Sequence, residues 1–158
     1  LIEKVLKMKP GVHERRDEHV VNIAMSSTNL VDFLISMGIK TGNKVKNQVD
    51  VPLWIKKNNS FKKSCLRGLM DTDGCIFNEC HRINKKIYCY PRLSFVNHSE
   101  PLLLFVFETA KELGFSPKIR NNRSVNLEKR EDIRKYFNTV GTSNKKHLNR
   151  FNKFGGIG

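Results

Sequence analysis

The sequence predicts an α+β fold in which helices cover one face of antiparallel β-hairpins. Three features support this prediction: a helix with two apolar faces at residues 61–72, strand pairs with alternating side chains after it, and a hairpin-plus-helix pattern that occurs twice. The chain has 158 residues, of which 39% are hydrophobic and 28% are charged. That length and composition suit a globular domain with a real core and exclude a disordered chain.

The N-terminal segment predicts a short helix, a hairpin and a second helix. Residues 1–9 are apolar at helical spacing, as in the tail of a helix. Residues 12–16 and 19–24 are expected to pair across a turn at residues 17–18. Residues 30–37 have the pattern of an amphipathic helix. Its candidate N-cap residues are Ser26, Ser27 and Thr28.

The helix at residues 61–72 has two apolar stripes. One stripe contains Phe61, Cys65 and Leu69, and the other contains Leu66 and Met70. Gly68 lies in the helix interior, where glycine costs about 1 kcal/mol relative to alanine. We therefore expect another backbone to approach the helix closely at this glycine.

Two aspartates, Asp71 and Asp73, follow at the C-terminal end of this helix, directly before Gly74. The helix macrodipole is negative there, so carboxylates are disfavoured unless something compensates them. A bound divalent cation would do so, because hard cations prefer carboxylate oxygens. The alternative is an ordinary polar turn, since Asp and Gly dominate turns.

Two strands are expected after Gly74, at residues 75–82 and 87–97, joined by a loop that contains Asn84, Lys85 and Lys86. Alternation predicts Ile76 and Cys80 on one face of the first strand. Further along, we expect a helix at residues 102–113, a second hairpin at 117–121 and 124–127, a helix at 130–140 and a basic tail through residue 153.

The hairpin-plus-helix pattern recurs at an offset of about a hundred residues. The similar segments are 19–23 with 123–127, 32–34 with 135–137, and 42–44 with 143–145. Chance similarity between two such units is the alternative for any one match. Three matches in the same order favour an internal repeat.

The formal net charge is +14 and the isoelectric point about 9.9. A pI above 9 is typical of nucleic-acid-binding domains. The alternatives are a generally basic protein or one that binds acidic membranes. No apolar run is long enough to span a bilayer, and the N-terminus lacks the apolar region of a signal peptide, so we expect an intracellular protein without a membrane partner.

Four cysteines occur, and without a secretion signal we expect free thiols rather than disulfides. A zinc site is a weaker alternative, because the spacing has no pair of cysteines two residues apart. Its candidate ligands would be Cys75, Cys80, His81 and Cys89.

The segment 66–74 resembles the LAGLIDADG motif of homing endonucleases. It matches that motif at Leu66, Gly68, Leu69, Asp71, Asp73 and Gly74, with Met70 a conservative variant. The resemblance implies an αββαββα repeat with a DNA-binding antiparallel sheet. Residues 61–158 would be one complete repeat, and residues 1–60 the C-terminal remnant of a preceding one, as in the C-terminal part of a two-repeat, DOD-type enzyme.

The resemblance also implies a site-specific, Mg²⁺-dependent endonuclease that acts on double-stranded DNA. By position, Asp73 would be the catalytic metal ligand, with Asp71 a less certain one. Lys44 and Lys145, which the internal repeat relates, would be the basic residues near the scissile phosphate, with Lys46 as the alternate. Two motif helices pair in this family, so Leu66, Gly68 and Leu69 are expected at a helix-pair interface. The partner would be a second copy in a homodimer or a missing N-terminal repeat.

The sheet predicted within residues 75–127 would bind DNA through its open face. The structural alternative is that an exposed polar strand face is ordinary in α+β proteins. The functional alternative to an endonuclease is a non-catalytic nucleic-acid binder, either an intron RNA maturase or a transcription factor of this fold. Candidates for base contacts are Glu79, His81, Tyr90, Arg92 and Ser94. Candidates for phosphate contacts are Lys85, Lys86, Lys118, Arg120 and Arg123. Arg82 and Lys46 are further DNA-binding candidates.

Overall fold

The computed structural model describes residues 2–15 and 20–154. The chain divides into two compact units, residues 1–37 and residues 38–158. The predicted α+β class is confirmed, because helices and antiparallel strands alternate along the chain. The expected boundary between repeats at residues 60 and 61 concerns the origin of the segments and stays a prediction.

The first unit contains a hairpin between two helices. Its elements are α1 (Ile2–Leu6), β1 (Gly11–Arg15), β2 (Val20–Ala24) and α2 (Thr28–Ser36). The strands pair antiparallel, and the turn expected at residues 17–18 lies outside the described residues. The predicted N-cap is confirmed, since the Ser27 side chain accepts a hydrogen bond from the Leu30 amide. None of the described residues of this unit is buried.

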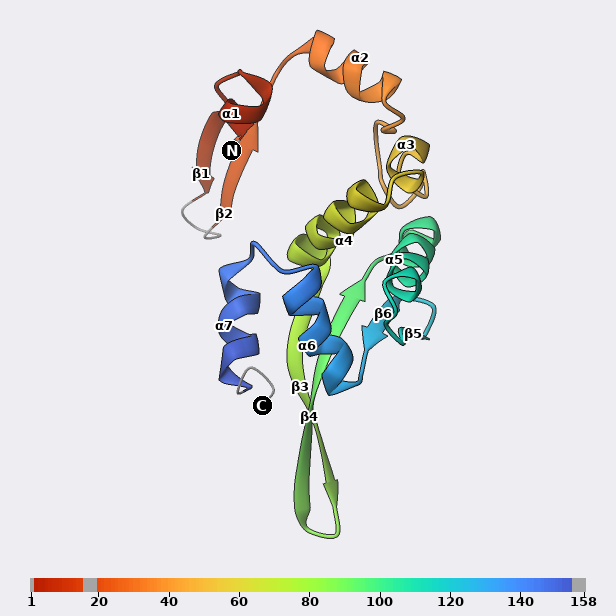
Figure 1. The fold of residues 1–158 in the computed structure, drawn as a ribbon. Helices are drawn as coiled ribbons and strands as arrows, with labels where there is room; N and C mark the ends of the chain where they lie inside the picture. The colour runs from red at the N-terminus through yellow and green to blue at the C-terminus, as the bar shows by residue number, and fades with distance from the viewer. Residues whose placement is uncertain (1, 16–19, 155–158) are drawn as a thin grey trace. The chain divides into compact units, whose positions relative to one another are not determined.

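A four-stranded antiparallel sheet forms the centre of the second unit (Figure 1). Its strands are β3 (Gly74–Ile83), β4 (Lys86–Val96), β5 (Lys118–Arg120) and β6 (Ser124–Leu127), in the order β3-β4-β6-β5. Of β4, only the last four residues pair with β6. The remaining parts of β3 and β4 therefore continue past the sheet as a two-stranded ribbon (Figure 1).

The turn of this ribbon is a two-residue loop. Asn84 and Lys85 both have positive φ, as the two central residues of a type I′ hairpin turn require. Lys86 was expected in the loop but is the first residue of β4, where it pairs with Ile83. The two-residue turn leaves no place for a third loop residue.

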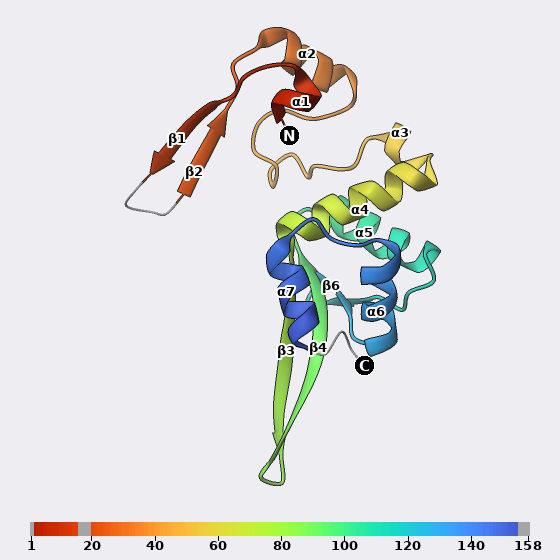
Figure 2. The same cartoon turned by 60° about the vertical axis from the view of Figure 1, so that its left-hand side comes forward.

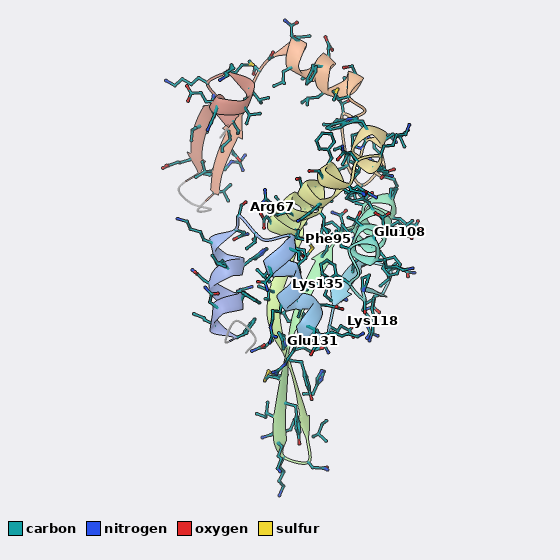
Figure 3. All side chains as sticks on the ribbon, in the orientation of Figure 1. Arg67, Phe95, Glu108, Lys118, Glu131 and Lys135 are labelled. Atoms are coloured by element: carbon teal, nitrogen blue, oxygen red, sulfur yellow. A yellow bond between two sulfur atoms is a disulfide. The ribbon has the colours of Figure 1, made fainter. Side chains whose placement is uncertain are left out.

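Five helices accompany the sheet: α3 (Leu53–Lys56), α4 (Asn59–Asp73), α5 (Glu100–Glu112), α6 (Arg130–Thr139) and α7 (Lys145–Lys153). Helix α4 crosses the end of the strands, and α6 and α7 run along them (Figure 2). The core lies between the sheet and these helices, with Phe95 inside it (Figure 3). Its most deeply buried apolar side chains are Phe95, Leu66, Ile76, Leu93 and Ile133.

Helix α7 corrects the expectation of a basic tail. Its sequence is dominated by polar and basic residues. Only His147 and Phe151 are buried, so the sequence shows no clear apolar stripe. They lie four residues apart on one face, and both are buried. Phe151 stacks on Phe137 of α6 at a centroid distance of 4.1 Å. The Asn144 side chain caps the helix by accepting from the Lys146 amide.

Two glycines of the motif segment behave differently. A Cβ added to Gly74 would lie 2.2 Å from the carbonyl oxygen of Met70, so only glycine allows the chain to turn from α4 directly into β3. A Cβ added to Gly68 would meet no atom within 4 Å. The close backbone approach expected at Gly68 is therefore absent from the described part of this single chain.

The ribbon carries a disulfide between Cys80 and Cys89, contrary to the expectation of free thiols. The two residues face each other across β3 and β4, and their Cα atoms lie 4.1 Å apart. Directly opposite positions on an antiparallel pair bring two side chains within bonding reach, a relation that the register fixes and the spacing alone did not. Cys65 and Cys75 are free.

Candidate nucleic-acid interface and metal site

The two motif aspartates have different surroundings. Both carboxylate oxygens of Asp71 accept hydrogen bonds from the loop between α6 and α7: one from the Thr142 hydroxyl and one, at 2.8 Å, from the Ser143 amide. The Asp71 carbonyl also accepts from the Asn144 side chain at 2.8 Å. Asp71 therefore fastens the start of α7 to the end of α4, and its role as a metal ligand stays a prediction.

Asp73 is more open. Its side chain is 34% exposed, and one oxygen, Oδ2, accepts a hydrogen bond from Asn97 Nδ2 at 3.0 Å. The ammonium group of Lys44 lies 3.8 Å from the same oxygen. Two residues assigned to catalysis from the sequence, Asp73 and Lys44, therefore meet at the end of α4.

Asn97 is a residue of this site that the sequence analysis did not identify. It is buried at 6% exposure, and its own side-chain oxygen accepts from the Ser99 amide at 2.9 Å. The backbone amide of Asn97 donates to the Arg123 carbonyl at 3.0 Å. The available signal was weak: an Asn at the end of a strand, two residues before the Ser-Glu-Pro start of a helix.

No ion pair between Asp73 and either of the other two basic candidates is recorded in the described part of the chain. Lys145 is exposed at the first position of α7. Lys46 is exposed in the segment before Val51, where its amide donates to the Asn43 side chain. Only Lys44 among the three has a recorded ion pair with Asp73.

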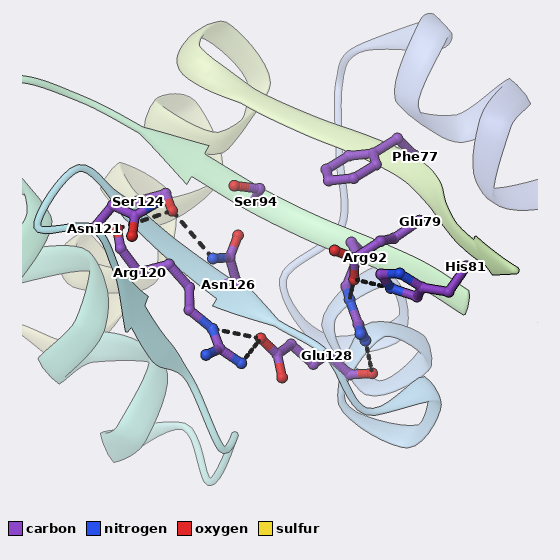
Figure 4. A pocket seen from close by; sticks show the side chains of 10 residues that line it. All are labelled: Phe77, Glu79, His81, Arg92, Ser94, Arg120, Asn121, Ser124, Asn126 and Glu128. Carbon is purple, nitrogen blue, oxygen red and sulfur yellow. Dashed lines mark hydrogen bonds and ion pairs between the residues drawn. The ribbon is translucent and has the colours of Figure 1, made fainter. Parts of the chain in front are cut away.

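The face of the sheet opposite the core is hollowed into a depression of about 580 Å³ (Figure 4). Strand alternation separates the two faces: Ile76, Leu93 and Phe95 point into the core, while Phe77 and Arg92 line the depression. The full lining is Phe77, Glu79, His81, Arg92, Ser94, Arg120, Asn121, Ser124, Asn126 and Glu128.

Charged groups in the depression are paired with one another. Arg92 Nε donates to Glu79 at 2.7 Å, and His81 Nε2 lies 3.6 Å from the same carboxylate (Figure 4). On the other side, Glu128 accepts from Lys118 at 2.7 Å and from Arg120 at 2.9 Å. The hydrogen bond from Arg92 lowers the pKa of Glu79, and the hydrogen bond from Lys118 lowers the pKa of Glu128. Both glutamates are therefore carboxylates at neutral pH.

Four of the ten lining residues were predicted as base-contacting candidates: Glu79, His81, Arg92 and Ser94. Glu128 was not identified, because its partners Lys118 and Arg120 come from a neighbouring strand and become visible only with the register. The remaining candidates are exposed on the ribbon or at a hairpin turn. They are Arg82, Lys85, Lys86, Tyr90 and Arg123.

The candidate helix-pair residues divide between two faces of α4. Leu66 is 2% exposed and belongs to the core of its own unit, which corrects its assignment to the interface. Leu69 is half-buried, and Gly68 is exposed beside Thr72. Phe61, on the same side, is 47% exposed. On this side of α4, Phe61 contacts Trp54 edge to face and Leu69 packs partly on the core, while Phe61 and Gly68 remain exposed in the described structure.

A hard cation would find one open carboxylate here, that of Asp73. Within residues 2–15 and 20–154, no three His, Cys, Asp or Glu side chains gather closely enough to hold a metal ion. Mg²⁺ prefers carboxylate oxygens as ligands. It is usually held by only one or two protein carboxylates, so it does not need a group of three. Asp73 is therefore the one carboxylate of this site whose exposure and donor type suit such an ion. No helix in the described part of the chain is both long and apolar enough to cross a membrane.

Comparison with family models matches residues 60–154 to the LAGLIDADG-like domain. Among solved structures, the chain is similar to the homing endonuclease I-CvuI in complex with the I-CreI target, with 15% identity, a TM-score of 0.47 and coverage of 58% of this chain and 62% of that one. It is also similar to the homing endonuclease I-TnaI, with 18% identity, a TM-score of 0.44 and coverage of 56% and 65%.

A third similar structure is the group I intron-encoded homing endonuclease I-CeuI complexed with DNA, with 14% identity, a TM-score of 0.45 and coverage of 80% of this chain and 61% of that one. The chain therefore spans a little under two thirds of the length of each of these three structures. No curated protein sequence matches it.

Proposed function

The chain belongs to the LAGLIDADG-like domain family, and from that membership we propose that it binds double-stranded DNA and supplies half of the active site of a site-specific, Mg²⁺-dependent endonuclease. The observation that carries the proposal is the pairing of Asp73 with Lys44 at the end of the motif helix α4. A carboxylate and an ammonium group in one place match the two charges of the reaction, a metal cation and a phosphate anion.

The residues around Asp73 have separate tasks in this proposal. Asn97 holds Oδ2 of Asp73 and so fixes the direction of the carboxylate. Lys44, with its side chain 63% exposed, can turn from Asp73 to a phosphate oxygen and neutralise its charge. A Mg²⁺ ion bound at Asp73 would supply Lewis-acid stabilisation and an activated water for phosphodiester hydrolysis.

The duplex would lie across the open face of the sheet. A two-stranded ribbon fits the major groove, and β3 and β4 project as such a ribbon beyond the sheet. The exposed Arg82, Lys85 and Lys86 at its tip would contact phosphates. Supporting this, the net charge of +14 favours an anionic partner.

The second half of the metal site would come from a second α4 helix, either in another copy of this chain or in a first repeat of a longer protein. Gly68 supports this, because the space around it is free and another backbone can approach there. The exposed Phe61 and half-buried Leu69 would lose water contact in such a pair, and each buried apolar side chain contributes roughly 1.5–3 kcal/mol.

Cleavage by Asp73→Asn tests the catalytic assignment. A supercoiled plasmid carrying a site selected with the wild type is incubated with protein and MgCl₂, with EDTA as the metal-free control. We expect the wild type to cleave, Asp73→Asn to bind but not cleave, and the matched variant Asp32→Asn on α2 to behave as the wild type. Equal cleavage by Asp73→Asn contradicts the role of Asp73. Metal-independent binding without cleavage by a wild type that sediments as a homodimer, and so carries both halves of the site, contradicts the nuclease and favours a non-catalytic binder.

Sedimentation of the wild type and of Gly68→Leu tests the helix pair. We expect a homodimer for the wild type and a monomer for the variant, because leucine at position 68 occupies the space that the second helix needs. A monomeric wild type assigns the second helix to another repeat. A dimer that leucine leaves unchanged contradicts pairing through α4.

A further inference from the structure

Glu128, directly after β6, connects three cationic side chains of the sheet face. Its Oε2 atom accepts from Lys118 Nζ at 2.7 Å, and its Oε1 atom accepts from Arg120 at 3.1 Å (Nε) and 2.9 Å (Nη2). Its backbone carbonyl accepts from Arg92 Nη1 at 3.0 Å (Figure 4). One residue therefore fixes partners from two strands, β4 and β5.

The geometry distinguishes Glu128 from a chance surface ion pair. Its side chain is only 15% exposed, whereas those of Lys118 and Arg120 are each 56% exposed. The carboxylate is thus much less exposed than the two cationic side chains that donate to it. Its pKa is lowered, first by the hydrogen bond from Lys118, so the carboxylate is ionised under the conditions in which DNA binds.

A carboxylate in this place opposes non-specific DNA binding. Sequence-independent affinity comes from Lys and Arg side chains that reach phosphates and release counterions. Glu128 neutralises two such side chains and restricts their rotation, which lowers their value as phosphate contacts. It also fixes the direction of the Arg120 guanidinium, and a guanidinium of fixed direction is suited to paired hydrogen bonds with a base edge.

We propose that Glu128 is a specificity-determining positioning residue, which holds Lys118 and Arg120 for base-edge contacts and withholds them from phosphates. The inference rests on the proposed DNA binding and adds a residue and a role to it. Glu79, at 2.7 Å from Arg92, acts in the same way on the other side of the depression. The sheet face is therefore a surface of pre-oriented cations and not a uniform basic patch.

The test uses Glu128→Gln, which keeps the shape of the side chain and removes its charge. Glu131→Gln is the matched control, because Glu131 is exposed in the first turn of α6 and has the same charge effect away from the depression (Figure 3). The probes are a random-sequence 30-bp duplex, a length of about three helical turns, and a duplex site selected from a randomised pool by the wild type. Dissociation constants are measured at several salt concentrations.

For Glu128→Gln we expect tighter binding to the random duplex and a steeper salt dependence. The slope of log K against log salt should grow by about 1–2, since each added phosphate contact contributes about 0.9. The preference for the selected site over the random duplex should fall by about tenfold or more, as for the loss of one good base contact. Glu131→Gln should change neither slope nor preference.

A double-mutant comparison separates the effect of Glu128 on Lys118 and Arg120 from an unspecific effect of Glu128→Gln on the structure. On a background of Lys118→Gln with Arg120→Gln, Glu128→Gln should no longer change the slope, because the cations it releases are gone. Trp54 fluorescence in a denaturant titration checks that each variant is folded. Identical behaviour of Glu128→Gln and Glu131→Gln, or an unchanged effect on the double-variant background, overturns the inference. A wild type that selects no sequence from the pool overturns the proposed function itself.

Discussion

The two hairpin-plus-helix segments of this chain have similar sequences and opposite burial. In the first, β1, β2 and α2 contain no buried residue among those described, and Val21 and Ile23 are 56% and 57% exposed. In the second, β5, β6 and α6 contribute Val125 and Leu127 to the core at 4% and 5% exposure. The strand pattern in both is the same alternation, so pattern alone does not decide burial.

The difference lies in what covers each segment. In the second unit, α5 packs against β6, and β4 pairs with it; together with α4 they form the other walls of the core. An isolated two-stranded hairpin is marginally stable at best, and no described residue of the first hairpin or of α2 is buried. In the second unit, the motif helix and its following hairpin therefore supply the apolar surface against which β6 is buried.

The largest expected effect comes from one substitution made at matched positions of the repeat. Leu127→Ala should lower the free energy of unfolding by about 2–5 kcal/mol, because it leaves a cavity in the core. Ile23→Ala should change it by less than about 0.5 kcal/mol, as is usual for surface substitutions. Denaturant titration followed by Trp54, the single tryptophan, measures the second unit. Equal losses from both variants would break the comparison.

A smaller effect is expected at the link between α4 and α7. Asp71→Ala removes the acceptor of the Thr142 hydroxyl and the Ser143 amide and should cost about 1.5–3 kcal/mol of unfolding free energy, the range for hydrogen bonds to a charged group. Asp32→Ala in the first unit, exposed on α2, should be neutral within about 0.5 kcal/mol. The same titration decides, and a neutral Asp71→Ala would contradict the fastening role.

The smallest effect concerns pH and sharpens the contrast between a buried and an exposed histidine. Burial lowers the pKa of His147 below its usual value of 6.5. The unfolded chain then binds more protons than the folded one between the folded pKa and 6.5, so stability is present above 6.5 and is lost as the pH falls through that window. His147→Gln should flatten this part of the stability profile between pH 7.5 and about 5. His13, in contrast, lies at an exposed position of β1.

Much of the second unit could be predicted from its sequence, because its signals are local. Alternation assigned Ile76 and Phe77 to opposite faces of β3, and the nine-residue motif identified α4 and its family. Helix α7 was missed because only two of its nine residues are buried, too few to produce a hydrophobic pattern. The Cys80–Cys89 disulfide depended on a register that the sequence did not specify.

The candidate site was predicted in part. Lys44 was selected through the internal repeat, and the structure places it 3.8 Å from Asp73. Asn97 and Glu128 were missed, because each acts through partners that are distant in sequence or on a neighbouring strand. The two stripes of α4 looked alike in the sequence, and only packing showed that Leu66 faces its own core. Helices and strands produce local sequence patterns, whereas contacts between these elements do not.

The most direct test of the account is the affinity of the wild-type chain for a random-sequence duplex, measured by fluorescence anisotropy across a series of salt concentrations. The account predicts that log K falls linearly with log salt and that several phosphate contacts contribute about 0.9 each to the slope. Such a slope agrees with a net charge of +14 and with the exposed lysines and arginines of the ribbon. Weak binding that salt does not change would contradict DNA binding and, with it, the proposed endonuclease.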